Sequence, residues 1–179
     1  MNLVVNGRCF VGENNSIGVK NNFQKINYLI SGSVRIGHNN KVESSMLLRF
    51  HSNLIIGNYN VINKGSQIRC DEEIIIGNFN QISYDTMIWD TNTHNIYSAK
   101  KRRELTISYH SGYEYEKPNT KQVLIGDDNW IGKSVVILKD TQIGDKCIIA
   151  YGTLLSKIKV KNSMTIMQNI ELKTFENNV

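Results

Sequence analysis

The sequence predicts an all-β fold, a parallel β-helix built from six-residue repeats. Within Val123–Leu155 an aliphatic residue stands at every sixth position: Ile125, Ile131, Ile137, Ile143, Ile149 and Leu155. Glycine follows three of them, at Gly126, Gly132 and Gly144. A period of six residues fits neither the α-helical period nor simple strand alternation. Short strands joined by tight turns would instead point one aliphatic side chain per repeat toward a common axis, with about eighteen residues in each coil.

The earlier part of the chain carries the same repeat in longer coils. Ile36-Gly37, Ile56-Gly57 and Ile76-Gly77 recur twenty residues apart, in the contexts GHNN, GNYN and GNFN. Further aliphatic residues stand six and twelve positions after each isoleucine, so a coil there consists of two hexads and an octad: Val42, Leu48, Ile62, Ile68, Ile82 and Ile88. Stacked coils contact only their neighbours. We therefore expect the asparagines to stack at the corners and to hydrogen-bond along the axis.

Two segments lie outside the repeat. Residues 95–122 are rich in charge and tyrosine, and a loop of this length inside a compact repeat is typically functional or disordered. We expect it to form an extruded arm, in which Lys100–Glu104 is either a solvated turn or a clamp for an anionic substrate. Residues 1–160 are predicted to form the β-helix domain. Residues 161–179 are predicted to form a C-terminal tail that covers the open end of the helix.

Composition limits the partners. The net charge is +5, but the basic residues are dispersed, which argues against nucleic acid and favours a general preference for anions. Cys9, Cys70 and Cys147 lie far apart without metal-ligand spacing and are expected to be buried free thiols. The N-terminus lacks a signal-peptide core, and no apolar run is long enough to span a membrane. The sequence thus predicts a cytoplasmic protein without a metal.

His94 is the main candidate for chemistry. It stands where the regular coils give way to the arm. Counting twenty residues places it above Ile74 and Leu54, which predicts an inward core position. Its place at the root of a loop on a rigid scaffold predicts a functional residue instead. Both interpretations remain open at this level.

The same count predicts two columns of side chains near His94. Arg49, Arg69 and Trp89 form one column, and His51, Asp71 and Thr91 form the next. These residues either form an ion-pair ladder facing solvent, with His51 paired to Asp71, or bind a polar acceptor through Arg69, Asp71, Trp89 and Asp90. Trp130 stands at an outward position of its hexad, which predicts contact with a ligand or another subunit.

These motifs together resemble a known family. The stretches WDTNTH and IGDDNWIGKSVVILKDTQIGDKCIIAYGTLLSK are similar to the hexapeptide-repeat acyltransferases, closest to the sugar and polysaccharide O-acetyltransferases that modify galactosides, maltose, capsule or lipopolysaccharide. The resemblance covers Val34–Lys157. It implies a left-handed β-helix, a homotrimer with active sites between subunits, and acetyl-CoA as the co-substrate.

The resemblance also implies roles for individual residues. His94 matches the family's general base, and the ordinary pKa of an imidazole, about 6.5, suits that role. Asp90 sets the tautomer of His94 or binds the acceptor, although backbone carbonyls orient the base in some relatives. Trp130 lines the channel for acetyl and pantetheine. A backbone N–H near Gly132–Lys133 would stabilise the tetrahedral intermediate.

The pantetheine is expected to pass close to the backbone at Ala150 and Gly152. On charge and position alone, Lys139, Lys157 and Lys159 are candidates to bind the coenzyme phosphates. The family's C-terminal Gly and Pro are missing from the matching stretch Ile166–Lys173. That departure concerns the adenine end of the coenzyme.

The function predicted from the sequence is acetyl transfer from acetyl-CoA to a sugar hydroxyl of a bacterial surface polysaccharide, such as capsule, lipopolysaccharide or a sialylated glycan. Transfer would be direct, because no activated serine or cysteine is apparent. The alternatives are N-acetylation of a nucleotide-linked amino sugar, or a non-catalytic or carbonic-anhydrase-like β-helix scaffold.

Overall fold

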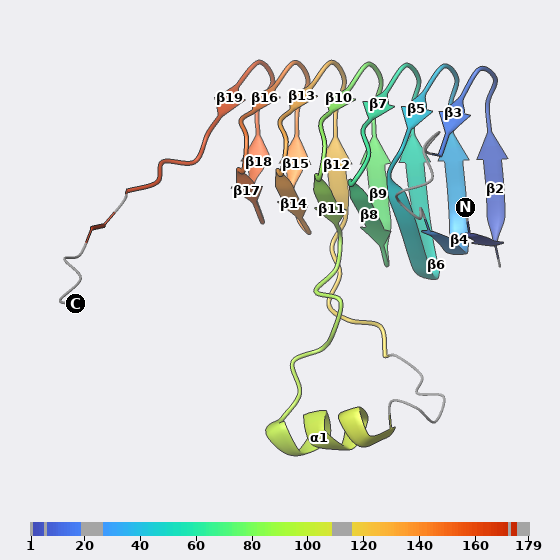
Figure 1. The fold of residues 1–179 in the computed structure, drawn as a ribbon, viewed down its shortest axis with the longest axis vertical. Coiled ribbons are helices and arrows are strands. Elements are labelled where there is room, and N and C mark those ends of the chain that lie inside the picture. The colour runs from blue at the N-terminus through green and yellow to red at the C-terminus, as the bar shows by residue number, and fades with distance from the viewer. Residues whose placement is uncertain (1, 6, 19–26, 109–115, 172, 175–179) are drawn as a thin grey trace.

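The structure, a computed structural model, describes residues 2–5, 7–18, 27–108, 116–171 and 173–174. The chain winds into a three-sided β-helix in which all strands pair in parallel, and one arm projects from its side (Figure 1). We call the three sides face I, face II and face III, in the order in which the chain passes through them.

The strands of face I are β8 (Gln67–Cys70), β11 (Met87–Trp89), β14 (Val136–Leu138) and β17 (Leu154–Leu155), with β1 (Asn2–Val5) at the N-terminal end. Face II contains β2 (Arg8–Val11), β9 (Glu73–Ile76), β12 (Val123–Ile125), β15 (Gln142–Ile143) and β18 (Lys159–Val160). Face III contains β3 (Ser16–Ile17), β5 (Lys41–Val42), β7 (Val61–Ile62), β10 (Gln81–Ile82), β13 (Trp130–Ile131), β16 (Ile148–Ile149) and β19 (Thr165–Ile166). The long strands β4 (Asn27–Ile36) and β6 (Ser45–Ile56) run from face I into face II.

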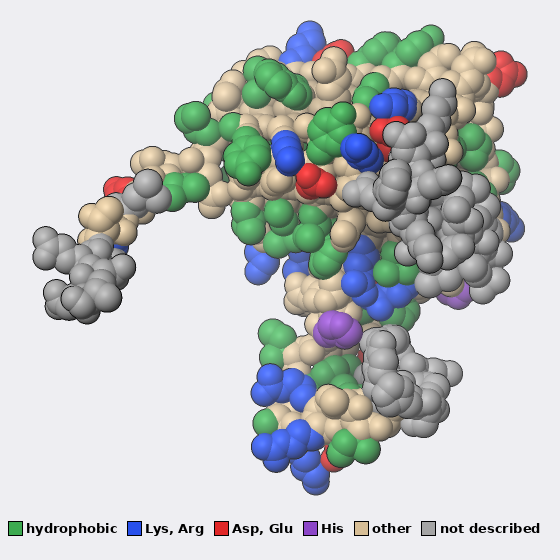
Figure 2. Space-filling model, viewed as in Figure 1, with side chains coloured by type: hydrophobic (Ala, Val, Ile, Leu, Met, Phe, Trp, Pro, Cys, Tyr) green, Lys and Arg blue, Asp and Glu red, His purple; other side chains and the backbone are tan. Residues whose placement is uncertain are grey.

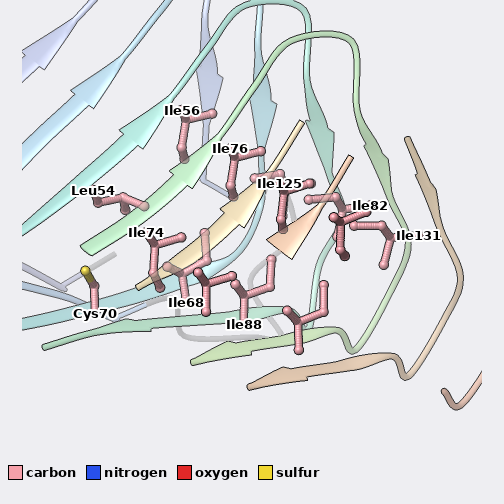
Figure 3. Packing of buried hydrophobic residues seen from close by; sticks show 14 of the residues in the cluster. Leu54, Ile56, Ile68, Cys70, Ile74, Ile76, Ile82, Ile88, Ile125 and Ile131 are labelled. Atoms are coloured by element: carbon pink, nitrogen blue, oxygen red, sulfur yellow. The ribbon is translucent and has the colours of Figure 1, made fainter. Parts of the chain in front are cut away.

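The predicted six-residue spacing produces the core. Strand alternation points the repeated aliphatic residue inward, and the register stacks it on its equivalents in the neighbouring coils, as for Ile62, Ile82, Ile131 and Ile149. All four side chains are buried. Figure 3 shows two of them, Ile82 and Ile131, within the packed core. Burial stabilises the fold by about 1.5–3 kcal/mol for each such side chain. The predicted left-handed β-helix of hexapeptide repeats is confirmed.

Asparagines stack along the corner between faces II and III, which we call the asparagine corner. The Nδ2 atoms of Asn60 and Asn80 each donate to the Oδ1 atom of the preceding asparagine, Asn40 or Asn60, at 3.1 Å. The same Oδ1 atoms accept the backbone N–H of the following coil at 2.8 and 2.9 Å. The predicted ladder is therefore confirmed, and it satisfies polar groups that the corner buries.

The arm leaves the corner between faces I and II, which we call the arm corner. Thr91 pairs antiparallel with Thr120, so the outgoing and returning segments form a narrow neck. The arm carries helix α1 (Ala99–Ser108), none of whose residues is buried. Val123 re-enters the β-helix beside Ile74 and occupies the core position that the coil count predicted for His94. His94 is exposed, so the inward interpretation is wrong.

Several boundaries and side chains differ from expectation. The coils continue to β19, six residues beyond the predicted end at residue 160, and Ile166 packs against the core. The described residues beyond it are exposed and run away from the body (Figure 1). Cys70 and Cys147 are buried, but Cys9 is exposed, because β2 presents an unburied surface near the N-terminal end. The described residues contain no helix long and apolar enough to cross a membrane.

Candidate functional site

His94 lies on the outgoing limb of the neck, which hydrogen bonds fix to the returning limb. The backbone N–H of Asn92 donates to the Asn119 carbonyl at 3.1 Å, and the N–H of Lys121 donates to the Asp90 carbonyl at 2.9 Å. Further out, the Tyr97 hydroxyl donates to the Glu116 carboxylate at 2.7 Å. The exposed imidazole is therefore carried by an ordered segment.

Asp90 is buried at the base of the neck. Its two carboxylate oxygens accept the backbone N–H groups of Asp71 and Glu72, each at 2.8 Å, and the Cys70 thiol lies 3.4 Å from Oδ2. Burial raises the pKa of Asp90, although the two N–H groups act in the opposite direction. Asp90 therefore secures the coil beneath it. That it also orients His94 or binds the acceptor stays a prediction.

The raised pKa predicts a pH-dependent stability. Because the folded state holds the proton of Asp90 more tightly than the unfolded chain does, the contribution of this group favours folding at low pH. That contribution is lost as the pH rises from about 3.9, the ordinary carboxyl value, through the folded-state pKa. We expect the free energy of unfolding of wild type minus that of Asp90→Asn to decrease over this range in urea titrations. Asp128→Asn, a charge removed from an exposed corner, is the control; a difference that increases with pH contradicts the assignment.

Arg49 and Asp71 form a partly buried ion pair with each other and do not belong to separate columns. Arg49 donates from Nε and Nη2 to the two carboxylate oxygens of Asp71, at 2.8 and 2.5 Å. The register places Leu47 beside Arg69 instead, because the chain uses two fewer residues to turn from face III into face I before β6 than before β8. The predicted column containing Arg49 is therefore wrong. Pairing of His51 with Asp71 at a solvent-facing surface is also wrong, since Asp71 is buried.

Arg69 and Trp89 come together on the outer surface of face I. They stand in register on β8 and β11, with the Arg69 guanidinium 5.5 Å from the centre of the Trp89 ring. With Ser45, Leu47 and Gln67 they line a hollow of about 390 Å³. Among the described residues, the buried Trp89 Nε1 has no hydrogen-bond partner. Asp71 is not part of this hollow, because its carboxylate is held by Arg49.

The residues predicted to bind the acetyl donor, acetyl-CoA, lie away from His94, at the end of face III. Trp130 is 58% exposed on face III, and the chain then turns into face I at Lys133, at what we call the third corner. A Cβ atom on Gly132 would lie 2.8 Å from the Tyr151 nitrogen, so the backbones approach closely there. The Gly132 N–H already donates to the Ile149 carbonyl at 2.8 Å. This leaves the N–H of Lys133 as the candidate donor to a tetrahedral intermediate.

The other predicted coenzyme residues divide between two corners. Ala150 and Gly152 lie at the third corner, whereas Lys139 and Lys157 lie at the arm corner and Lys159 begins β18 on face II. Lys139 donates to Asn119 Oδ1 at 2.7 Å; desolvation and the charge of Lys157 lower the pKa of Lys139. Trp130 and Lys133, predicted to contact acetyl-CoA, and His94 therefore lie on opposite edges of face I.

Among the described residues no three His, Cys, Asp or Glu side chains gather to hold a metal, and the predicted absence of a metal stays a prediction.

Sequence reasoning missed the apolar outer surface of face I. Met87, Val136 and Leu154 stack in register there, and Leu138 stands beside Trp89 in the next column. We call Met87, Val136, Leu138 and Leu154, all outward-facing, the face I patch. The exposed fraction of Leu154 is 51%. The signal was present, because apolar residues flank the inward isoleucine on both sides in Met87–Trp89 and Val136–Leu138. A polar outer residue would be expected on a solvated strand.

Comparisons with known proteins agree with the fold. Residues 122–157 match the family model described as bacterial transferase hexapeptide (six repeats). The solved structure of the polySia specific acetyltransferase NeuO is similar, with a TM-score of 0.64 and 18% identity over 99% of this chain and 84% of that chain. The polysialic acid O-acetyltransferase OatWY matches with a TM-score of 0.35 and 22% identity over 93% of this chain and 94% of that chain. None of the curated proteins matches the sequence.

Proposed function

We propose that this hexapeptide-repeat protein is an acetyl-CoA-dependent O-acetyltransferase that modifies a polysaccharide. The observation that carries the proposal is the exposed His94, held at the root of an ordered neck on a transferase-type β-helix. In the proposed reaction, an acceptor hydroxyl oxygen attacks the thioester carbonyl carbon while His94 takes the hydroxyl proton. The carbon–sulfur bond then breaks, the sulfur receives the proton, and an O-acetyl ester and free coenzyme A thiol leave.

The acceptor in this proposal is an acidic polysaccharide. The hollow on face I offers an arginine charge and an indole face with a buried N–H, a combination that suits a sugar ring bearing a carboxylate. Figure 2 shows Lys and Arg side chains gathered on the projecting arm, where Lys100–Arg103 are all exposed. The similar NeuO structure is that of a polySia specific enzyme, which supports the same chemical class.

The proposed assembly is a homotrimer that buries the face I patch. Apolar outer residues on a β-strand favour burial against another surface. Three copies that turn face I toward a threefold axis would bring the arm corner of one subunit toward the third corner of the next. His94 of one chain would then meet Trp130 and Lys133 of its neighbour. Because acetyl-CoA is a cytoplasmic metabolite, the proposal includes a cytoplasmic location.

The test is thiol release from acetyl-CoA by the purified protein with three acceptors: a neutral oligosaccharide, an acidic polysaccharide and a nucleotide-linked amino sugar. We expect thiol release with the acidic polysaccharide as the acceptor. Hydroxylamine should then remove the acetyl group from the product, because it cleaves esters. A hydroxylamine-stable product on the amino sugar would support N-acetylation instead. No turnover together with no calorimetric binding of coenzyme A would support a scaffold.

Removing the charges of α1 is expected to weaken use of the acidic polymer. The change is to replace Lys100, Lys101, Arg102 and Arg103 by glutamine, which disturbs no buried residue. If each exposed charge contributes a few tenths of a kcal/mol, KM for the polymer rises about tenfold and depends less on salt. The control removes four exposed lysines from the body: Lys41, Lys64, Lys146 and Lys161. An equal rise in KM in the control would indicate net charge rather than the arm.

A further inference from the structure

An ion pair with a fully buried carboxylate and a partly buried guanidinium lies beneath the turn that carries His94. The Arg49 guanidinium contacts both carboxylate oxygens of Asp71, at 2.8 and 2.5 Å. The Asp71 side chain has no exposed surface, and that of Arg49 is 16% exposed. Such two-point pairing is both strong and directional. The guanidinium is also stacked over Phe50, at 4.9 Å from its ring centre, so its plane is fixed from a second side.

This pair contacts the outgoing limb of the neck directly and is linked to the returning limb through Asp90. Arg49 Nη2 lies 3.5 Å from the carbonyl oxygen of Thr93, the residue immediately before His94. The backbone N–H of Asp71 donates to Asp90, whose own carbonyl accepts the N–H of Lys121 on the returning limb. Displacement of the pair would therefore move the segments on either side of His94.

The backbone at Thr93 needs such support. Its φ is 67°, in the left-handed region that β-branched residues rarely adopt. The backbone N–H of Thr93 donates a hydrogen bond to Thr91 Oγ1, at 3.0 Å, and its carbonyl oxygen faces Arg49. The backbone of Thr93 is thus held on both sides. Strained conformations persist where the surroundings fix them, and they gather at functional sites.

We propose that Arg49, held by Asp71, is a positioning residue that sets the aim of the His94 imidazole through the Thr93 carbonyl. Its effect on turnover rests on the proposed function; its effect on His94 does not. Arg49 itself is poorly suited to bind the acceptor, because its guanidinium group is already hydrogen-bonded to Asp71. Stability alone does not account for the pair, since hydrophobic residues commonly replace a buried ion pair without loss. A role in fixing the backbone at Thr93, and with it the position of His94, does account for the pair.

The test separates positioning from stability by removing one charge or both. Arg49→Met leaves Asp71 buried without its counter-ion and is expected to lower stability. The double variant Arg49→Met, Asp71→Leu removes both charges and is expected to unfold near the wild-type temperature. Arg35→Met, which removes an exposed arginine from face II, is the matched control. His94 is followed by NMR of imidazoles labelled with 15N and 13C, with His38 as the internal reference.

In the double variant we expect the His94 signals to shift while those of His38 stay in place. Turnover should fall between about ten- and a hundredfold, as for a misplaced catalytic group, with KM for acetyl-CoA unchanged. A stable double variant with wild-type His94 signals and turnover would overturn the proposal. If the wild type transfers no acetyl group, the proposed function fails, and the His94 signals still decide the positioning role.

A second variant covers the case in which the double variant does not fold. Arg49→Lys keeps the charge opposite Asp71 but offers a flexible point charge in place of the planar fork. We expect a folded protein whose His94 signals shift in the same direction. Unchanged His94 signals in Arg49→Lys would show that only the charge matters and would also overturn the proposal.

Discussion

Replacement of His94 by alanine is expected to lower turnover by about two orders of magnitude or more, which is the usual contribution of a general base. The fold should be unaffected, because His94 is exposed and Val123 fills the core position beside Ile74. The measurement is thiol release at saturating acetyl-CoA and acceptor, together with thermal unfolding and the molecular mass in solution. A change confined to turnover would identify a chemical rather than a structural role.

His38→Ala is the matched control for this experiment. His38 is also exposed, and its Nδ1 accepts the backbone N–H of Glu13 at 3.0 Å on the asparagine corner, away from the neck. We expect this variant to retain wild-type turnover. If His94→Ala retained it as well, another group would have to remove the acceptor proton, and the assignment of the base would fail.

The core could be predicted from the sequence because one periodic constraint determines it. A β-helix must place an apolar side chain inward in every coil, so the recurring isoleucines gave the register of residues far apart in the chain, such as Ile82 and Ile131. The same count could not show where the chain leaves a coil. The insertion begins after Asp90 and returns before Val123, and a constant step of twenty residues therefore placed His94 in the core.

The site was less predictable because it lies at corners, where the coils differ. β6 enters face I two residues early and recovers them at Phe50 and His51, both with left-handed φ values, so Arg49 lies beside Asp71 instead of stacking on Arg69. A linear count assigns those residues to a strand. The pairing of Arg69 with Trp89 was predicted correctly, because both lie on regular strands before the corner.

Mixing two inactive variants is expected to restore activity if the site lies between subunits. His94→Ala chains retain the residues of the third corner that we propose to bind acetyl-CoA, and Trp130→Ala chains retain the proposed base at the arm corner. Trp130 is 58% exposed, so its removal should not disturb the core. Each complete site would take its histidine from one variant and its tryptophan from the other. Random trimers formed from equal amounts would therefore contain about a quarter of their sites intact, and trimers that contain both variants about a third.

The variants should be co-expressed with different tags, and mixed trimers purified through both tags before thiol release is measured. Pairing His94→Ala chains with chains that carry both substitutions supplies no intact histidine, and should give no recovery. Leu138→Asp in both variants places a charge on the face I patch and should prevent assembly and recovery together. Mixed trimers that form but stay inactive would contradict a site shared between chains. In that case, His94 and its donor residues would have to meet within one subunit, across the width of face I.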